Sequence, residues 1–213
     1  MTLNGRLAVA RLNKFKGQGN YGLGAGNKNP NSTSPFEWKN GYYACDCISA
    51  VLWAYLVPKH HPNFPEYEGY INVDSALMDA GLLSGGNGKC TFFTPVTEAK
   101  DVLIGDMVAF PSIRAKELGD TSLSPSTRCR VGHIGLIAGW RDINQMDPDE
   151  SKTPWNGKVS DLVVLECSSG WPAIKFGYDK NFHIRDNRSV CIWKNIIHTN
   201  EKWATRVIRY IGP

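Results

Sequence analysis

Apolar residues recur at helical spacing in one early segment of the chain, residues 47–56. Counted from its first apolar residue, they fall at offsets of three, four, seven and eight positions, which is typical of a helix buried along one face. The residues that make this pattern are Ile48, Val51, Leu52, Tyr55 and Leu56. We therefore predict a buried helix that begins at Cys47.

Shorter apolar runs predict strands from residue 104 onward. A turn followed by a strand is predicted within residues 104–110, and the clearest strand covers residues 131–139. Further strands of an antiparallel sheet are predicted at residues 162–167, 173–176, 190–193 and 206–211. Weaker patterns predict a short helix over residues 3–14 and another over Ser75–Ala80, capped by Asp74. Together these elements predict an α+β fold.

Residues 17–41 are dominated by Gly, Asn, Pro, Ser and Thr, which predicts a long surface loop. Within it Tyr21 stands beside Gly22, Gly24 and Gly26, where the backbone could approach a ligand closely. The alternative is that this segment only connects two elements. With 213 residues and 42% hydrophobic content, we expect one domain over residues 1–213, with loop insertions near residues 58–100, 112–130 and 141–160.

The net charge of +4 comes from scattered lysines and arginines. This weakly favours an acidic polymer as a partner and gives no case for nucleic acid binding. The sequence has no long apolar run, so we expect no signal peptide and no transmembrane segment. The six cysteines show no CxxC spacing and are too few for a disulfide scaffold, so most are expected to be reduced, buried and structural.

Cys47 is a candidate nucleophile because of its place at the predicted helix start. Asp46 stands where an N-cap residue belongs, so its carboxylate is expected to accept a hydrogen bond from the first turn. The positive end of the helix dipole favours the thiolate, which is the nucleophilic form of cysteine. A carboxylate beside the thiol opposes this, so capping is the role expected of Asp46. The alternative for Cys47 is a buried structural cysteine.

His133 and Glu166 are candidates for the groups that would activate this thiol. Gly132 and Gly135 flank His133 and leave room for a helix that carries a nucleophile. Glu166 lies near the end of an apolar strand, where a carboxylate needs a partner, and His133 is the obvious one. A cysteine nucleophile requires a base and a third group that orients the base. The alternatives are a satisfied core histidine and an exposed carboxylate at a strand end.

Metal binding is a less favoured interpretation of the histidines. His60 and His61 are neighbours in a predicted loop, but an exposed histidine pair is more often plain surface. A zinc site that uses Cys129 and His133 is a second alternative. We expect no metal and no other cofactor.

These local contexts resemble the NlpC family of papain-like bacterial cell-wall peptidases. In that family an Asp-Cys pair opens a buried helix, a Gly-Asp turn leads into a strand, and a His-(Val/Ile)-Gly strand follows. The next strand carries a polar residue, usually His, that orients the catalytic histidine, and an upstream Tyr-x-x-Gly element lies near the oxyanion site. The matching segments here are Asp46-Cys47, Gly105-Asp106, Gly132-His133-Ile134-Gly135, Val164–Gly170 and Tyr21-Gly22-Leu23-Gly24. The resemblance covers points between about residues 20 and 176.

The resemblance implies a papain-like fold of the NlpC type, in which an antiparallel sheet packs against the central helix. It also implies hydrolysis of an amide bond in the peptide stem of peptidoglycan by Cys47, His133 and Glu166. Tyr21 would then help to bind the oxyanion, and Asp46 would hold a free ammonium of the substrate, with Ser49 as a further contact. Where the family has Ser-Gly after the nucleophile, this chain has Ile48-Ser49.

Two other functions are compatible with these residues. The first is a papain-like acyltransferase or amidase that acts on another substrate. The second is a non-catalytic cell-wall-binding or structural module. For a wall hydrolase without a signal peptide, the expected location is synthesis in the cytoplasm and action at the bacterial cell wall. Delivery would then depend on a phage tail, a secretion machine or release by lysis.

Overall fold

The structure, a computed structural model, describes residues 4–39, 41–110, 132–140, 154–157, 162–167, 190–194 and 206–212. Its helices are α1 (Gly5–Asn13), α2 (Cys47–Ala54) and α3 (Val73–Asp79), with 3-10 turns η1 (Tyr67–Gly69) and η2 (Ala99–Asp101). Its strands are β1 (Asn20–Tyr21), β2 (Glu37–Lys39), β3 (Tyr42–Cys45), β4 (Phe93–Pro95), β5 (Met107–Phe110), β6 (His133–Trp140), β7 (Leu162–Cys167), β8 (Val190–Lys194) and β9 (Arg206–Tyr210). The described chain is therefore a mixed α+β protein, as predicted.

In the described residues, the larger sheet has six strands in the order β4-β9-β5-β6-β7-β8, and every neighbouring pair is antiparallel. Leu136 on β6 lies opposite Leu165 on β7, and the register shifts beyond Ile137. Continued toward the start of β6, this register places Gly135 opposite Glu166. All six residues of β7 are buried, so the continuous apolar run predicted from sequence is a strand covered on both faces.

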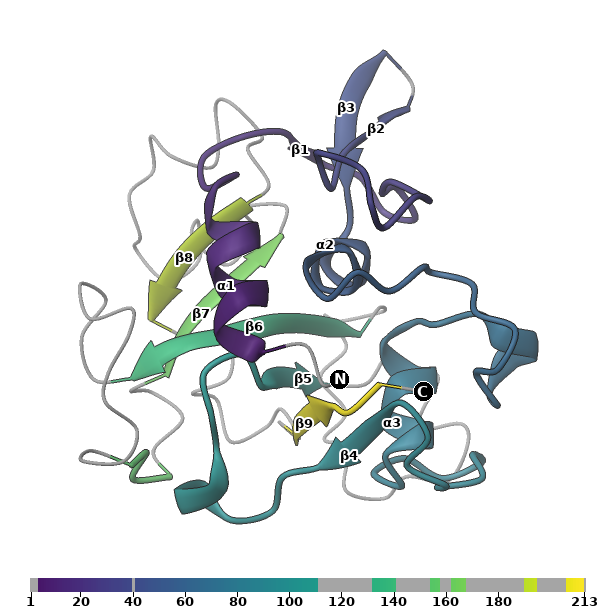
Figure 1. The fold of residues 1–213 in the computed structure, drawn as a ribbon, viewed down its shortest axis with the longest axis vertical. Coiled ribbons are helices and arrows are strands. Elements are labelled where there is room, and N and C mark those ends of the chain that lie inside the picture. The colour runs from purple at the N-terminus through teal and green to yellow at the C-terminus, as the bar shows by residue number, and fades with distance from the viewer. Residues whose placement is uncertain are drawn as a thin grey trace, which may run out of the picture.

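Helices α1 and α2 pack against β6 and β7 (Figure 1). All eight residues of α2 are buried. The predicted helix is therefore correct in position, but the prediction that only one face is buried is wrong, because other elements surround α2. The helix ends at Ala54, and Leu56 of the predicted pattern is 39% exposed.

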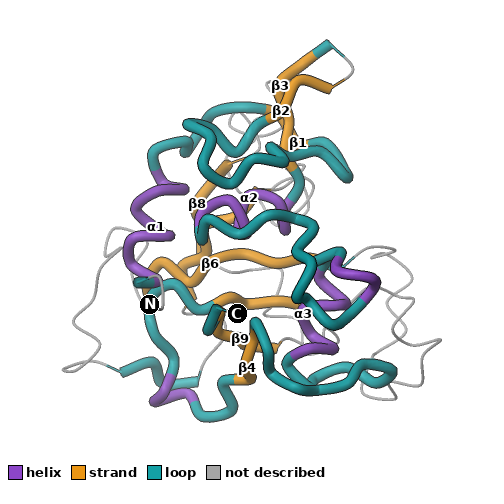
Figure 2. Tube along the Cα trace, turned by 45° about the vertical axis from the view of Figure 1, so that its right-hand side comes forward, coloured by secondary structure: helices purple, strands orange, loops and turns teal. Residues whose placement is uncertain are grey.

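A second sheet, with the order β1-β3-β2 in the described residues, stands at one end of the molecule, and β4 and β9 lie toward the opposite end (Figure 2). Strand β1 is parallel to β3 and pairs Tyr21 with Cys45, whereas β2 is antiparallel to β3. The prediction that residues 17–41 form only a loop is wrong, because β1 and β2 lie within them. The last residue of β3 is followed by one cap residue and then by α2, so this small sheet fixes where α2 begins.

Helix α3 begins earlier than predicted. Its N-cap is Asn72, whose side chain accepts a hydrogen bond from the Ser75 amide at 2.9 Å, while the Ser75 hydroxyl accepts one from the Asn72 amide at 2.8 Å. This reciprocal pair is a capping box, and it replaces the predicted cap at Asp74. Helix α3 and β4 both lie within residues 58–100, so this segment, predicted as a loop insertion, supplies an edge strand of the main sheet.

The predicted strand at residues 173–176 and the predicted insertion at residues 112–130 lie outside the described residues, as does most of residues 141–160. None of the helices in the described ranges combines the length and the apolar character needed to cross a membrane.

Candidate active site

Cys47 is the first residue of α2, and Asp46 is its N-cap. The Asp46 Oδ1 atom accepts a hydrogen bond from the Ser49 amide at 2.8 Å, which confirms the predicted cap. The first amides of a helix have no acceptor within the helix itself, so the start of α2 presents positive partial charge beside the thiol. Cys47 is 4% exposed, which makes its sulfur a buried group at the edge of the core.

Tyr21 on β1 lies close to this helix start because its strand pairs with β3. Burial raises the pKa of Tyr21 above its ordinary value, and negative charge on Cys47 and Asp46 raises it further. The phenol therefore stays neutral at physiological pH and keeps its proton. A neutral hydroxyl near the thiol can donate a hydrogen bond to an oxygen that becomes negative during a reaction.

The glycines after Tyr21 bring the loop against α2. The Gly24 amide donates a hydrogen bond to Asp46 Oδ2 at 2.9 Å, and the Gly26 amide donates one to Glu37 Oε1 at 3.0 Å. A Cβ atom placed on Gly26 would lie 2.2 Å from the Ser49 Cβ, so only glycine fits there. The glycines do permit a close backbone approach, and at Gly26 it is an approach to the helix.

His133 and Glu166 meet across neighbouring strands. The His133 Nε2 atom lies 2.5 Å from Glu166 Oε2, and the two side chains are 13% and 1% exposed. Gly135 makes this possible, because a Cβ on it would come within 2.5 Å of Val164 Cγ1 and 3.3 Å of Glu166 Oε2. Side chains of β7 fill the space beside Gly135, and α2, the helix that was expected to approach this strand, packs against β6.

The imidazole of His133 also interacts with Cys47. Burial alone would lower the pKa of His133, but the charge of Glu166, the charge of Cys47 and hydrogen bonds to both raise it well above its ordinary value. Glu166 engages the Nε2 atom of the ring. The structure therefore brings Cys47, His133 and Glu166 together in the order predicted from sequence.

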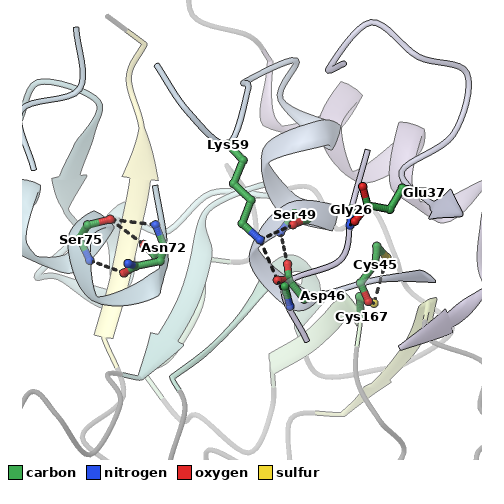
Figure 3. A network of polar contacts seen from close by, with 10 residues as sticks. Gly26, Glu37, Cys45, Asp46, Ser49, Lys59, Asn72, Ser75 and Cys167 are labelled. Carbon is green, nitrogen blue, oxygen red and sulfur yellow. Dashed lines mark hydrogen bonds and ion pairs between the residues drawn. The ribbon is translucent and has the colours of Figure 1, made fainter. Parts of the chain in front are cut away.

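Lys59 is a member of this site that the sequence did not suggest. Its Nζ atom lies 2.8 Å from Asp46 Oδ2 and donates a hydrogen bond to Ser49 Oγ at 2.9 Å (Figure 3). Burial lowers the pKa of Lys59, but its interactions with Asp46 and Tyr70 outweigh this and raise it. The side chain is therefore charged. A possible signal was Asp46 itself, because a buried carboxylate needs a compensating donor.

The predicted substrate contacts of Asp46 and Ser49 have to be judged against these bonds. The Asp46 carboxylate already accepts hydrogen bonds from the backbone amides of Ser49 and Gly24 and from the ammonium of Lys59. The Ser49 hydroxyl also accepts a hydrogen bond from the Lys59 ammonium, and Ser49 is only 5% exposed. Their binding of a substrate ammonium thus remains a prediction, and Lys59 would have to give up its place for it.

Two further cysteines lie next to the candidate triad. The Sγ atoms of Cys45 and Cys167 are 3.1 Å apart, and Cys167 Sγ lies 3.1 Å from the Cys45 carbonyl oxygen. Both residues are fully buried, and neither is in a disulfide. Because Cys45 precedes Asp46 and Cys167 follows Glu166, this contact joins β3, which leads into α2, with β7, which carries Glu166.

The metal alternatives gain no support from the described part of the chain, where no cluster of three His, Cys, Asp or Glu side chains is arranged to hold a metal ion. The ring of His61 packs edge-on against Phe92 with centroids 4.8 Å apart, and His60 is exposed. Cys129, which belongs to the zinc alternative, lies outside the described residues.

No protein-family model, no curated protein and no solved structure matches the chain. Its function therefore has to be inferred from the residues and geometry of the site.

Proposed function

We propose that this protein is a cysteine peptidase of the NlpC type that hydrolyses an amide bond in the peptide stem of bacterial peptidoglycan. The observation that carries the reaction type is the contact chain from Cys47 through His133 to Glu166, placed at the start of a buried helix. A thiol, an imidazole and a carboxylate in this order make up the machinery of nucleophilic acyl transfer. The substrate class is supported by the resemblance of the sequence motifs.

The first chemical step uses the charges of the resting site. The raised pKa of His133 favours the imidazolium form, which pairs with the Cys47 thiolate. The thiolate sulfur attacks the carbonyl carbon, a C–S bond forms, and the π electrons of the carbonyl move onto its oxygen. The backbone amide of Cys47 and the hydroxyl of Tyr21 are the donors that would stabilise this oxyanion.

Proton transfers by His133 complete the reaction. The imidazolium gives a proton to the leaving nitrogen, the C–N bond breaks, and a thioester remains on Cys47. Neutral His133 then takes a proton from a water molecule as that water attacks the thioester. A C–O bond forms, the C–S bond breaks with its electron pair on the Cys47 sulfur, and the acid product leaves. The thiolate and protonated His133 restore the resting ion pair. Glu166 holds Nε2 throughout and so fixes the orientation of the ring.

Digestion of purified sacculi tests this proposal. The native protein is expected to release muropeptides with new peptide ends, which mass spectrometry can locate within the stem. Cys47→Ala should lower the rate at least about 10⁴-fold while changing the free energy of unfolding by only about 1 kcal/mol. Cys90→Ala is the matched control, since Cys90 is a partly exposed cysteine outside the triad, and it should retain full activity.

Three outcomes would contradict the proposal. Activity that survives Cys47→Ala would show that this thiol is not the nucleophile. Sacculi that are bound but not cleaved would favour a wall-binding module. Products in which the released acyl group is joined to an amine, with no new carboxylate, would favour an acyltransferase.

A further inference from the structure

The Asp46 carboxylate creates an electrostatic problem for the neighbouring thiol. It is 4% exposed and belongs to the residue just before Cys47. A buried negative charge so close to the sulfur disfavours a second negative charge there. The helix start and His133 act in the opposite direction. The state of the thiol therefore depends on what compensates the charge of Asp46.

Lys59 supplies that compensation from a different segment. Its ammonium lies 2.8 Å from Asp46 Oδ2, its side chain is 17% exposed, and its backbone carbonyl accepts a hydrogen bond from the Ile71 amide at 2.8 Å. The ring centroid of Tyr70 lies 5.7 Å from the ammonium. A buried anion and a hydroxyl therefore hold the charge in one place (Figure 3), and the aromatic ring of Tyr70 lies beside it.

We propose that Lys59 is a positioning residue of this site, whose ammonium cancels the charge of Asp46 so that His133 can hold Cys47 as the thiolate. This inference rests on the proposed role of Cys47 as nucleophile. Lys59 acts through Asp46, and its ammonium also joins the hydroxyl of Ser49 to the same carboxylate. The expected result of losing Lys59 is a thiol that is less ionised at neutral pH.

The other ionisable groups near the thiol are included in this balance. His133 lies 2.5 Å from Glu166, and the charges of Glu166 and Cys47 both favour its protonated form. Tyr21 stays neutral because its pKa is raised. In the described part of the chain, the ionisable groups that interact with this cluster include Tyr21, Cys45, Asp46, Lys59, Tyr70, His133, Glu166 and Cys167. Removing Lys59 therefore takes away the cation that pairs with Asp46 and leaves the carboxylate with the amides of Ser49 and Gly24.

The rate of Cys47 alkylation by iodoacetamide, followed from acid to alkaline pH, reads out the thiolate without any substrate. Modified Cys47 is distinguished from Cys45 by peptide fragmentation in the mass spectrometer. In Lys59→Met, alkylation at neutral pH should slow about tenfold, which corresponds to a midpoint about one pH unit higher. Lys59→Arg should keep the native profile within about threefold. Lys100→Met removes an exposed lysine of η2 and should change nothing.

A double-mutant cycle separates charge compensation from a purely structural role. Asp46→Asn removes the carboxylate but keeps a good N-cap residue, and it should move the midpoint to lower pH. Asp46→Asn combined with Lys59→Met removes both charges and should return the alkylation rate to within about threefold of the native rate. Asp46→Asn tests the inference even if Lys59→Met does not fold, because its shift does not depend on that variant.

Unchanged alkylation in folded Lys59→Met, no shift in Asp46→Asn, or a double variant as slow as Lys59→Met would each overturn the inference. Peptidoglycan digestion by Cys47→Ala tests the proposed function separately. If that variant remains active while the alkylation cycle behaves as expected, the charge balance stands and the proposed function fails.

Discussion

Two buried aspartates, Asp46 at the start of α2 and Asp79 at the end of α3, accept hydrogen bonds from backbone amides in similar ways but lie in different surroundings. Asp79, the last residue of α3, accepts from the amides of Thr91, Phe92 and Phe93 at 2.8–3.0 Å. Asp46, the cap of α2, accepts from the amides of Ser49 and Gly24. The difference is that Asp46 also pairs with an ammonium and adjoins a thiol that contacts an imidazole.

This difference teaches that burial of a carboxylate does not by itself indicate catalysis. At the Asp79 end the buried charge ties the strand β4 to α3, because each amide it receives would otherwise need another partner. At the Asp46 end the same kind of bonding also sets charges around Cys47. Substitutions near Cys47 should therefore change rates more than stability, and substitution of Asp79 should do the reverse.

The largest of the remaining effects on rate is expected for Glu166→Gln. Loss of the charge that pairs with His133 should lower kcat/KM about 10³-fold, because the ring loses both its orientation and its stabilised imidazolium. Glu166 raises the pKa of His133, so the substitution lowers that pKa. The alkaline limb of the kcat/KM profile, where His133 loses its proton, should therefore move to lower pH.

The free energy of unfolding should depend on pH through the same change in the pKa of His133. A raised pKa in the folded chain means that protonation of His133 favours folding. This contribution is fully present below the unfolded value of about 6.5 and is lost as the pH rises through the folded value. Urea unfolding at several pH values should show that the loss begins at lower pH in Glu166→Gln. If the alkaline limb of the kcat/KM profile does not move in Glu166→Gln, Glu166 does not control the pKa of His133. The proposed difference between the Asp46 and Asp79 surroundings would then lose this support.

A smaller effect on rate is expected for Tyr21→Phe. If the hydroxyl stabilises the oxyanion, its removal should lower kcat about 10²-fold with little change in KM. Tyr55→Phe is the matched control, because the hydroxyl of this buried tyrosine donates to the Gly105 carbonyl. It should cost about 1 kcal/mol of stability and leave kcat within about twofold. Equal kcat values for Tyr21→Phe and Tyr55→Phe would show that the Tyr21 hydroxyl does not stabilise the oxyanion.

Local sequence patterns predicted the elements with strong apolar signals. Helix α2 and strands β5, β6, β7 and β9 lie where the apolar patterns placed them. The short strands β1 and β2 were missed because they have only two and three residues and depend on pairing with β3. The cap of α3 was misplaced because Asp74 and Asn72 are both suitable cap residues. Only the reciprocal bond with Ser75 favours Asn72.

The site residues also differ in whether a local sequence pattern marks them. Cys47 and His133 were found because each stands in a local context that points to chemistry, and Glu166 because a carboxylate in an apolar strand requires a partner. Lys59 has no such context, since it follows a proline in a connecting segment. Its role depends on how that segment folds back onto Asp46, and this was not visible before the contacts between distant residues were known.

The smallest effect on rate and the largest on stability are expected for Asp79→Ala. This change leaves the amides of Thr91, Phe92 and Phe93 without their acceptor, and unpaired buried amides are costly, so the free energy of unfolding should fall by about 3 kcal/mol. Urea unfolding would measure the loss. The kcat of the folded fraction should stay within about twofold of native, because none of these groups belongs to the triad. A kcat loss as large as that of Tyr21→Phe would mean that the α3 end is coupled to catalysis, and the division between the two ends would then be wrong.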